Sequence, residues 1–203
     1  MKAELRRQHI LDCAKQVFAE KGYYEAYVED VIKMAHIGKG TIYEYFRNKE
    51  DLFFSVLLRS LQDWKNAIAI SHEEIKQLSP ASYFHLRVKR SLIFMNEDRQ
   101  LTSIILRTGF GFNPHIQKFI GEFEKNLQNQ ILHDLRLGKH LGFLKDNVDL
   151  HVITSILVGG IVMIAAHYIL SEPVLSDVEV DKLTNKIVYP FIKGIFNENN
   201  LRE

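Results

Sequence analysis

Apolar side chains recur at helical spacing over long stretches of this chain, and prolines interrupt it only at positions 80, 114, 173 and 190. Near the N-terminus, Ile10, Ala14, Val17 and Phe18 stand where they share one face of a helix. No run of strict polar and apolar alternation is long enough to indicate a strand. The sequence therefore predicts an all-α fold of about nine helices.

Composition narrows the class of protein further. Hydrophobic residues make up 46% of the chain and charged residues 25%, which is typical of a folded globular protein and excludes extensive disorder. Cys13 is the single cysteine, so an internal disulfide is excluded. The polar N-terminus lacks the apolar segment of a signal peptide. We therefore expect a cytoplasmic setting, with Cys13 as a small buried residue.

A pair of short helices is expected at residues 28–35 and 39–46, after an amphipathic helix over about residues 3–20. Two short helices joined by three residues are typical of a helix-turn-helix. In the second of them, Ile42 and Phe46 are four positions apart and predict a buried face. The opposite face presents donors for phosphates and base edges, namely Lys39, Thr41, Tyr43, Tyr45 and, just beyond the helix, Lys49.

Glycines flank the start of this second helix. Gly38 leaves backbone N–H groups open to a phosphate, and Gly40 allows a DNA backbone to come close. The formal net charge is only +1, and residues 1–52 carry equal numbers of basic and acidic side chains. DNA binding would therefore depend on local donors rather than on bulk charge. Spacing alone leaves a second interpretation open, in which the aromatic residues are the core of a small helical bundle.

A longer motif favours DNA binding over that alternative. The run KGTIYEYF at residues 39–46 is followed by NKEDL at residues 48–52, and Ile10, Ala14, Phe18 and Gly22 precede it. These residues resemble the DNA-binding domain of the TetR/AcrR family of bacterial transcriptional repressors. The resemblance implies a helix-turn-helix domain at residues 1–50. Residues 51–203 would then form a diverged helical domain for ligand binding and dimerisation.

The resemblance also implies roles for individual residues. Tyr43 and Lys49 stand where members grip phosphates, and the recognition helix would contact DNA through Lys39, Gly40, Thr41 and Tyr45.

Four positions depart from the family pattern. Tyr27 replaces the usual capping Ser or Thr, although its hydroxyl could reach a phosphate by another route. His36 replaces a Gly in a left-handed turn, Gly38 replaces a Ser, and Ile32 replaces an Ala. We expect these departures to affect the turn geometry and the operator preference.

An uncharged stretch at residues 152–170 is long enough to cross a membrane. Its polar side chains and the absence of flanking basic clusters favour a helix packed in protein instead. Gly159 and Gly160 permit close contact between helices. The resemblance implies that this helix and the last one form a homodimer, which places two recognition helices on a palindromic operator of double-stranded DNA. The residues that we expect at the dimer interface are Ile153, Ile156, Gly159, Gly160, Met163, Leu183, Ile187 and Phe191.

Large side chains are dense between Phe84 and Phe123, which suits a cavity for a small apolar or aromatic effector. We expect that the effector favours a dimer state that does not bind DNA. The candidate ligand contacts are Trp64, Phe84, His85, Phe94, Arg107, Phe110, His115, Phe119, Phe123, Met163 and His167.

Enzymatic function has little support in the sequence. His133 and His140 are seven positions apart, which is not a paired metal site, and neither a phosphate-binding glycine loop nor a nucleophile elbow occurs. We expect no catalytic residue, metal or cofactor. The departures at Tyr27, His36 and Gly38 keep one alternative open, a helical small-molecule-binding or adaptor protein that has lost sequence-specific DNA binding.

Overall fold

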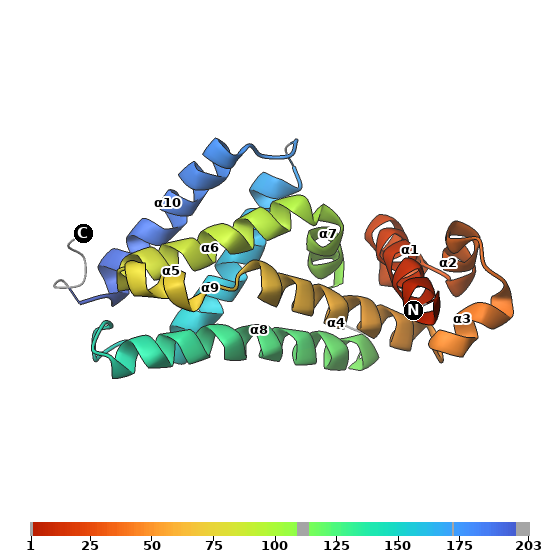
Figure 1. The fold of residues 1–203 in the computed structure, drawn as a ribbon, viewed down its shortest axis with the longest axis horizontal. Coiled ribbons are helices and arrows are strands. Elements are labelled where there is room, and N and C mark those ends of the chain that lie inside the picture. Colours follow the sequence, from red (N-terminus) through yellow and green to blue (C-terminus); the bar gives the residue numbers. More distant parts are fainter. Residues whose placement is uncertain (1, 109–113, 172, 198–203) are drawn as a thin grey trace. The chain divides into compact units, whose positions relative to one another are not determined.

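The structure is a computed structural model that describes residues 2–108, 114–171 and 173–197 (Figure 1). Within these residues it contains ten α-helices and one π-helical turn. The described residues also include one isolated antiparallel β-bridge, between Leu144 and Phe196. The all-α prediction is confirmed.

The first four helices are α1 (Lys2–Glu25), α2 (Val28–Ala35), α3 (Lys39–Tyr45) and α4 (Lys49–Ala67). The bounds of α2 and α3 agree with the prediction to within one residue. The backbone of α1 leaves helical geometry at Gly22, with φ 74° and ψ 168°, a left-handed φ that favours glycine.

The start of α4 is stabilised by the side chain of Asn48. Asn48 Oδ1 accepts a hydrogen bond from the Asp51 N–H at 2.8 Å. This contact satisfies one of the N–H groups that a helix start leaves without an intrahelical partner.

Six further α-helices follow, and their bounds are α5 (His72–Gln77), α6 (Pro80–Glu97), α7 (Arg99–Thr108), α8 (Pro114–His140), α9 (Leu150–Ile164) and α10 (Asp177–Ile195). Helix α5 is a separate short helix after α4. Ser71 and Glu74 form a capping box at its start, with Glu74 N–H to Ser71 Oγ at 3.2 Å and Ser71 N–H to Glu74 Oε2 at 2.8 Å. Helix α9 continues into the π-helical turn η1 (Ala165–Ile169).

The chain divides into two compact units. The N-terminal unit comprises residues 1–63 and 98–123, and the C-terminal unit comprises residues 64–97 and 124–203. The predicted boundary at residue 50 therefore falls inside a unit, because α4 continues the N-terminal unit to Asp63. Helix α7 also belongs to the N-terminal unit, which the sequence analysis does not foresee.

An aromatic core holds the N-terminal unit together. Phe18 and Phe53 are fully buried, with ring centroids 4.9 Å apart in an edge-to-face arrangement. Tyr23 packs on Phe53 with the same centroid distance. Such edge-to-face pairs add to the burial of the rings themselves. Cys13 is also buried, as expected.

Helix α7 is attached to α1 along its length. Asp98, just before α7, forms an ion pair with Lys15. Further along α7, Ser103 Oγ donates to the Ala19 carbonyl at 3.4 Å, and Arg107 Nη1 donates to the Glu20 carbonyl at 3.1 Å. The last two bonds satisfy carbonyls close to the break at Gly22.

The core of the C-terminal unit lies between α6, η1 and α10, and Figure 1 shows α6 and α10 side by side. Leu92 of α6 and Ile169 of η1 are fully buried there. Leu183 and Ile187 of α10 belong to the same cluster and are only 9% and 8% exposed. These two residues were expected at the dimer interface, but they pack inside their own protomer because the apolar face of α10 covers α6.

A membrane-length apolar helix is present at Leu150–Ile169, and 22% of it is buried. Length and composition alone would allow this segment to cross a bilayer.

Candidate DNA-binding site

The turn between α2 and α3 is formed by His36, Ile37 and Gly38. His36 adopts the left-handed conformation, with φ 52° and ψ 44°. The sequence prediction of a left-handed turn at His36, where the family has a glycine, is confirmed. The Ile37 N–H donates to the Ile32 carbonyl at 3.2 Å, which closes the end of α2.

Helix α3 has one buried and one exposed face. Ile42 and Phe46 are 1% and 3% exposed, as their spacing predicts. The guanidinium of Arg7 lies 5.4 Å from the centroid of the Phe46 ring. On the opposite face Lys39 and Tyr43 are exposed, so their polar groups are open to an external partner.

The start of α2 uses a carboxylate in place of a side-chain cap from Tyr27. The Tyr27 N–H donates to Asp30 Oδ2 at 3.0 Å, and Lys21 Nζ lies 2.8 Å from Asp30 Oδ1. Both contacts hold the pKa of Asp30 below its ordinary value. The Tyr27 side chain makes no capping hydrogen bond and is 66% exposed, which leaves its hydroxyl at the surface.

The Lys49 side chain, which the family motif assigns to phosphate binding, makes contacts within the protein. Its Nζ donates to the Tyr24 carbonyl at 3.2 Å and lies 4.5 Å from the centroid of the Tyr23 ring. Burial lowers the pKa of the Lys49 ammonium group. The side chain therefore joins the start of α4 to the end of α1, a structural role that the sequence analysis misses.

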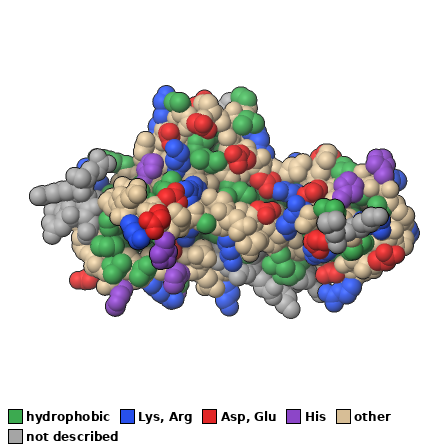
Figure 2. Space-filling model, viewed as in Figure 1, with side chains coloured by type: hydrophobic (Ala, Val, Ile, Leu, Met, Phe, Trp, Pro, Cys, Tyr) green, Lys and Arg blue, Asp and Glu red, His purple; other side chains and the backbone are tan. Residues whose placement is uncertain are grey.

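Two further cations near the helix-turn-helix, Lys39 and Arg47, are paired with carboxylates. Lys39 Nζ lies 3.3 Å from Glu29 Oε1. Arg47 Nε lies 3.3 Å from Asp51 Oδ2, and the same oxygen accepts the Arg47 N–H at 3.0 Å. Figure 2 shows basic and acidic side chains intermixed over the face in view. Carboxylates close to the exposed cations neutralise their charge locally, which agrees with the equal numbers of basic and acidic residues in this part of the chain.

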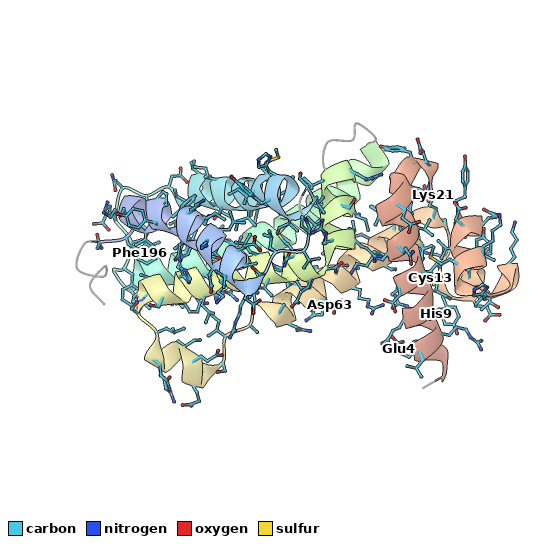
Figure 3. The ribbon with its side chains drawn as sticks, turned by 90° about the horizontal axis from the view of Figure 1, so that it is seen from above. Glu4, His9, Cys13, Lys21, Asp63 and Phe196 are labelled. Carbon is cyan, nitrogen blue, oxygen red and sulfur yellow. The ribbon has the colours of Figure 1, made fainter. Side chains whose placement is uncertain are left out.

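Helix α1 supports the end of α2 from the other side. His9 Nε2 lies 3.2 Å from the Ala35 carbonyl oxygen, and Cys13 Sγ lies 3.9 Å from the same nitrogen. Figure 3 shows both side chains along α1. The contact fixes the residue that immediately precedes the left-handed turn.

Residues 10–56 match the sequence model described as bacterial regulatory proteins, tetR family. This segment is a DNA-binding domain of the TetR family. The chain is a DNA-binding transcriptional regulator. The sequence prediction of the family is confirmed. The individual DNA contacts remain predictions.

Similarity to other regulators extends over almost the whole chain. The fatty acid metabolism regulator protein of Bacillus subtilis is 26% identical over 193 residues, which cover 93% of this chain and 95% of that protein. The fatty acid degradation regulator FadR of Bacillus halodurans superimposes with a TM-score of 0.79 at 22% identity, covering 93% and 95% of the two chains. FadR of B. subtilis, solved in complex with stearoyl-CoA, gives a TM-score of 0.78 at 23% identity, covering 92% and 98%.

The predicted ligand contacts fall into different surroundings. Trp64 is buried, and Phe84 lies against Phe196 with a centroid distance of 5.8 Å, so both contribute to packing in the C-terminal unit. His85 Nε2 lies 2.9 Å from Asn185 Oδ1. Phe94 is half-buried. All four residues belong to the C-terminal unit, and their role as ligand contacts remains a prediction.

The other predicted ligand contacts lie in the N-terminal unit, at the protomer surface or outside the described residues. Arg107 belongs to the N-terminal unit and donates to the end of α1. Met163 is 55% exposed and His167 is also exposed, so both lie at the surface of the protomer. Phe110 and the side chains of His115, Phe119 and Phe123 lie outside the described residues.

A small pocket of about 30 Å³ lies between α1 and α4 and includes Asp12, Lys15 and Arg59 in its lining. It has room for a water molecule but not for an organic effector. It contains none of the predicted ligand contacts.

Proposed function

We propose that this chain is a cytoplasmic repressor that binds a palindromic operator as a homodimer and leaves it when a long-chain acyl-CoA binds. The observation that carries the DNA-binding part is the exposed face of α3. It places Lys39 and Tyr43 at the surface, above the buried Ile42 and Phe46. A helix packed on one face, with donors on the other, can enter a major groove without unfolding its own support.

Gly40 adds to this proposal. A side-chain carbon built at Gly40 would meet no atom within 4 Å. Packing within the protein therefore does not require a glycine at this position. Close approach of a DNA backbone gives a reason for the small residue there.

The dimer would use the exposed side of α9. Val152, Ile156 and Met163 are 52%, 50% and 55% exposed, and Gly159 is exposed between them. Their spacing of four, three and four positions is that of the seam between two packed helices. The face of α10 opposite its buried side adds Tyr189, which is 61% exposed. Burial of these side chains by a second protomer would remove apolar surface from water.

An acyl-CoA effector is favoured by the similarity to the fatty acid regulators, which spans the C-terminal unit as well as the DNA-binding one. Such a ligand has an apolar chain, which agrees with the apolar effector that the sequence analysis expects. Its binding would shift the population between two states of the dimer.

The first test is selection of genomic DNA fragments on the purified protein at about 50 mM salt, where phosphate contacts are strong. Enrichment of one short palindrome is expected. The double variant Lys39→Ala/Tyr43→Ala should remain folded and lose that enrichment, because both side chains are exposed. Wild-type binding by this variant would contradict the assigned face. Absence of any selectivity in wild-type protein freed of ligand by unfolding and refolding would favour the alternative function without DNA recognition.

The second test adds stearoyl-CoA to the protein–operator complex, with free CoA and free stearate as controls. Release of DNA by the thioester alone is expected. Binding of stearoyl-CoA without any change in operator affinity would contradict the proposed coupling. A reporter gene behind the enriched palindrome would separate repression from activation.

A further inference from the structure

An ion pair connects the first turns of the two helices of the helix-turn-helix. Lys39 is the first residue of α3, and Glu29 lies in the first turn of α2. Lys39 Nζ and Glu29 Oε1 are 3.3 Å apart. The two side chains are 70% and 54% exposed, so the pair lies at the surface with both charged groups accessible. Any DNA that Lys39 touches must therefore lie close to the carboxylate of Glu29.

Glu29 differs from its neighbour Asp30, which is also acidic. Asp30 receives the Tyr27 N–H and pairs with Lys21, so its carboxylate stabilises the start of α2. The side chain of Glu29 pairs with Lys39, and the pKa of Glu29 is lowered first by a hydrogen bond from its own backbone and then by the Lys39 ammonium group. The Asp30 carboxylate is thus directed at the start of α2 and at Lys21, whereas the Glu29 carboxylate also faces the first residue of α3.

The chemistry of DNA limits what a carboxylate can do there. Phosphate oxygens repel it, because both groups are anionic and neither can donate a hydrogen bond. In the major groove, a carboxylate is matched by the N4 amino group of cytosine, and a lysine is matched by O6 and N7 of guanine. A guanine–cytosine pair presents these donors and acceptors side by side on one edge. A lysine and a glutamate held 3.3 Å apart are complementary to that edge.

We propose that Lys39 and Glu29 together read one guanine–cytosine base pair in each operator half-site, with Lys39 donating to guanine and Glu29 accepting from cytosine. The proposal rests on the proposed function, in which α3 enters the major groove. It names a base pair that the operator must contain and makes Glu29 a determinant of specificity.

The test compares selections from random DNA by the full-length wild-type dimer and by the variants Glu29→Ala and Lys39→Ala. The wild-type selection should contain an invariant guanine–cytosine pair in each half-site. Both variants should relax that same pair. Exchange of this base pair for adenine–thymine should weaken operator binding by the wild type about tenfold or more. The same exchange should weaken operator binding by Glu29→Ala less than about threefold.

A matched control comes from an exposed pair in another unit. Lys76 Nζ and Glu73 Oε1 are 2.9 Å apart on α5, with side chains 66% and 79% exposed. Glu73→Ala changes the net charge as Glu29→Ala does, and its selected sequence should equal that of the wild type. Affinity for unrelated DNA should rise in Glu29→Ala only, because a carboxylate near phosphates is removed.

Three results would overturn the proposal. The first is that either variant keeps the wild-type preference at every position, and the second is that the two variants relax different base pairs. The third is that the relaxed pair is adenine–thymine in the wild-type selection. Failure of the proposed function is distinct, since the wild type would then select no sequence at all. Thermal melting and sedimentation of each variant would verify that it is a folded dimer.

Discussion

Lys15 of α1 forms an ion pair with Asp98, which stands just before α7 and 83 positions away in the sequence. The two side chains are only 19% and 17% exposed. The pair therefore attaches a helix that follows α6 in the sequence to the first helix of the DNA-binding unit. A signal that moves α7 would be passed directly to α1 through this contact.

Replacement of Lys15 by Met should destabilise the N-terminal unit. The change leaves a mostly buried carboxylate at Asp98 without its partner, and we expect a loss of about 2 kcal/mol in the free energy of unfolding. Urea unfolding measures it. Lys76→Met is the control, because the exposed pair on α5 should contribute less than about 1 kcal/mol. Equal effects of the two substitutions would show that burial of the first pair has no energetic importance.

Lys49→Met tests whether this lysine is structural as well as a DNA contact. It removes the hydrogen bond to the Tyr24 carbonyl and the ammonium group from the Tyr23 ring. We expect a decrease of about 1–2 kcal/mol in the unfolding free energy without DNA. Lys33→Met, at an exposed position of α2, should change stability by less than about 0.5 kcal/mol. An unchanged stability of Lys49→Met would restrict the lysine to phosphate binding.

The acid stability of the N-terminal unit should depend on Asp51. Its pKa is lowered chiefly by hydrogen bonds from the Arg47 side chain and backbone. A carboxyl group whose pKa is lower in the folded state stabilises above its unfolded pKa of about 3.9, and this contribution is lost as the pH falls through the folded value. The unfolding free energy should therefore decrease below about pH 4.

Asp51→Asn should make that decrease shallower, because the variant has no carboxyl group to protonate at this position. The comparison requires urea midpoints for both proteins over a series of acidic pH values. Parallel pH profiles for the two proteins would exclude Asp51 as a source of the acid sensitivity.

His36→Gly should stabilise the protein, by up to about 1 kcal/mol, because glycine adopts the left-handed conformation without steric cost. His36→Ala should have the opposite effect, since alanine lacks the tolerance of histidine for this conformation. Thermal melting of the three proteins gives the order directly. A glycine variant no more stable than the wild type would mean that the turn is not strained.

Ile156→Glu should separate the proposed dimer into folded monomers. The side chain is 50% exposed in the protomer, so a charge there costs little until a second chain covers it. Sedimentation would show the change in mass, and operator affinity should fall more than about tenfold because two linked half-site contacts become one. Val174→Glu, at another exposed position, should remain dimeric. A dimeric Ile156→Glu protein would exclude this face of α9.

Much of the fold could be predicted because apolar spacing and caps are local signals. The spacing of Ile42 and Phe46 placed the buried face of α3, and both side chains are buried in the structure. Helix α5 was missed although Ser71 and Glu74 have the spacing of a capping box.

The remaining differences depend on contacts between distant segments. Leu183 and Ile187 form an apolar stripe that suits either a partner chain or the protomer's own α6, and periodicity cannot distinguish the two. The attachment of α7 to α1 joins residues 83 positions apart, so no local pattern indicates it. The pairing of Glu29 with Lys39 likewise requires the angle between two helices, which spacing does not specify.

The paired cations of the helix-turn-helix have a consequence for the response to ionic strength. Lys21, Lys39 and Arg47 have protein carboxylates as neighbours rather than depending on dissolved anions alone. DNA association depends on salt because ions are released as phosphates meet cations. Because the protein's own carboxylates neutralise part of the charge on these cations, fewer dissolved ions are exchanged with the solvent when DNA binds. Occupancy of the operator should consequently vary less with the osmotic state of the cell than for a regulator with unpaired lysines and arginines.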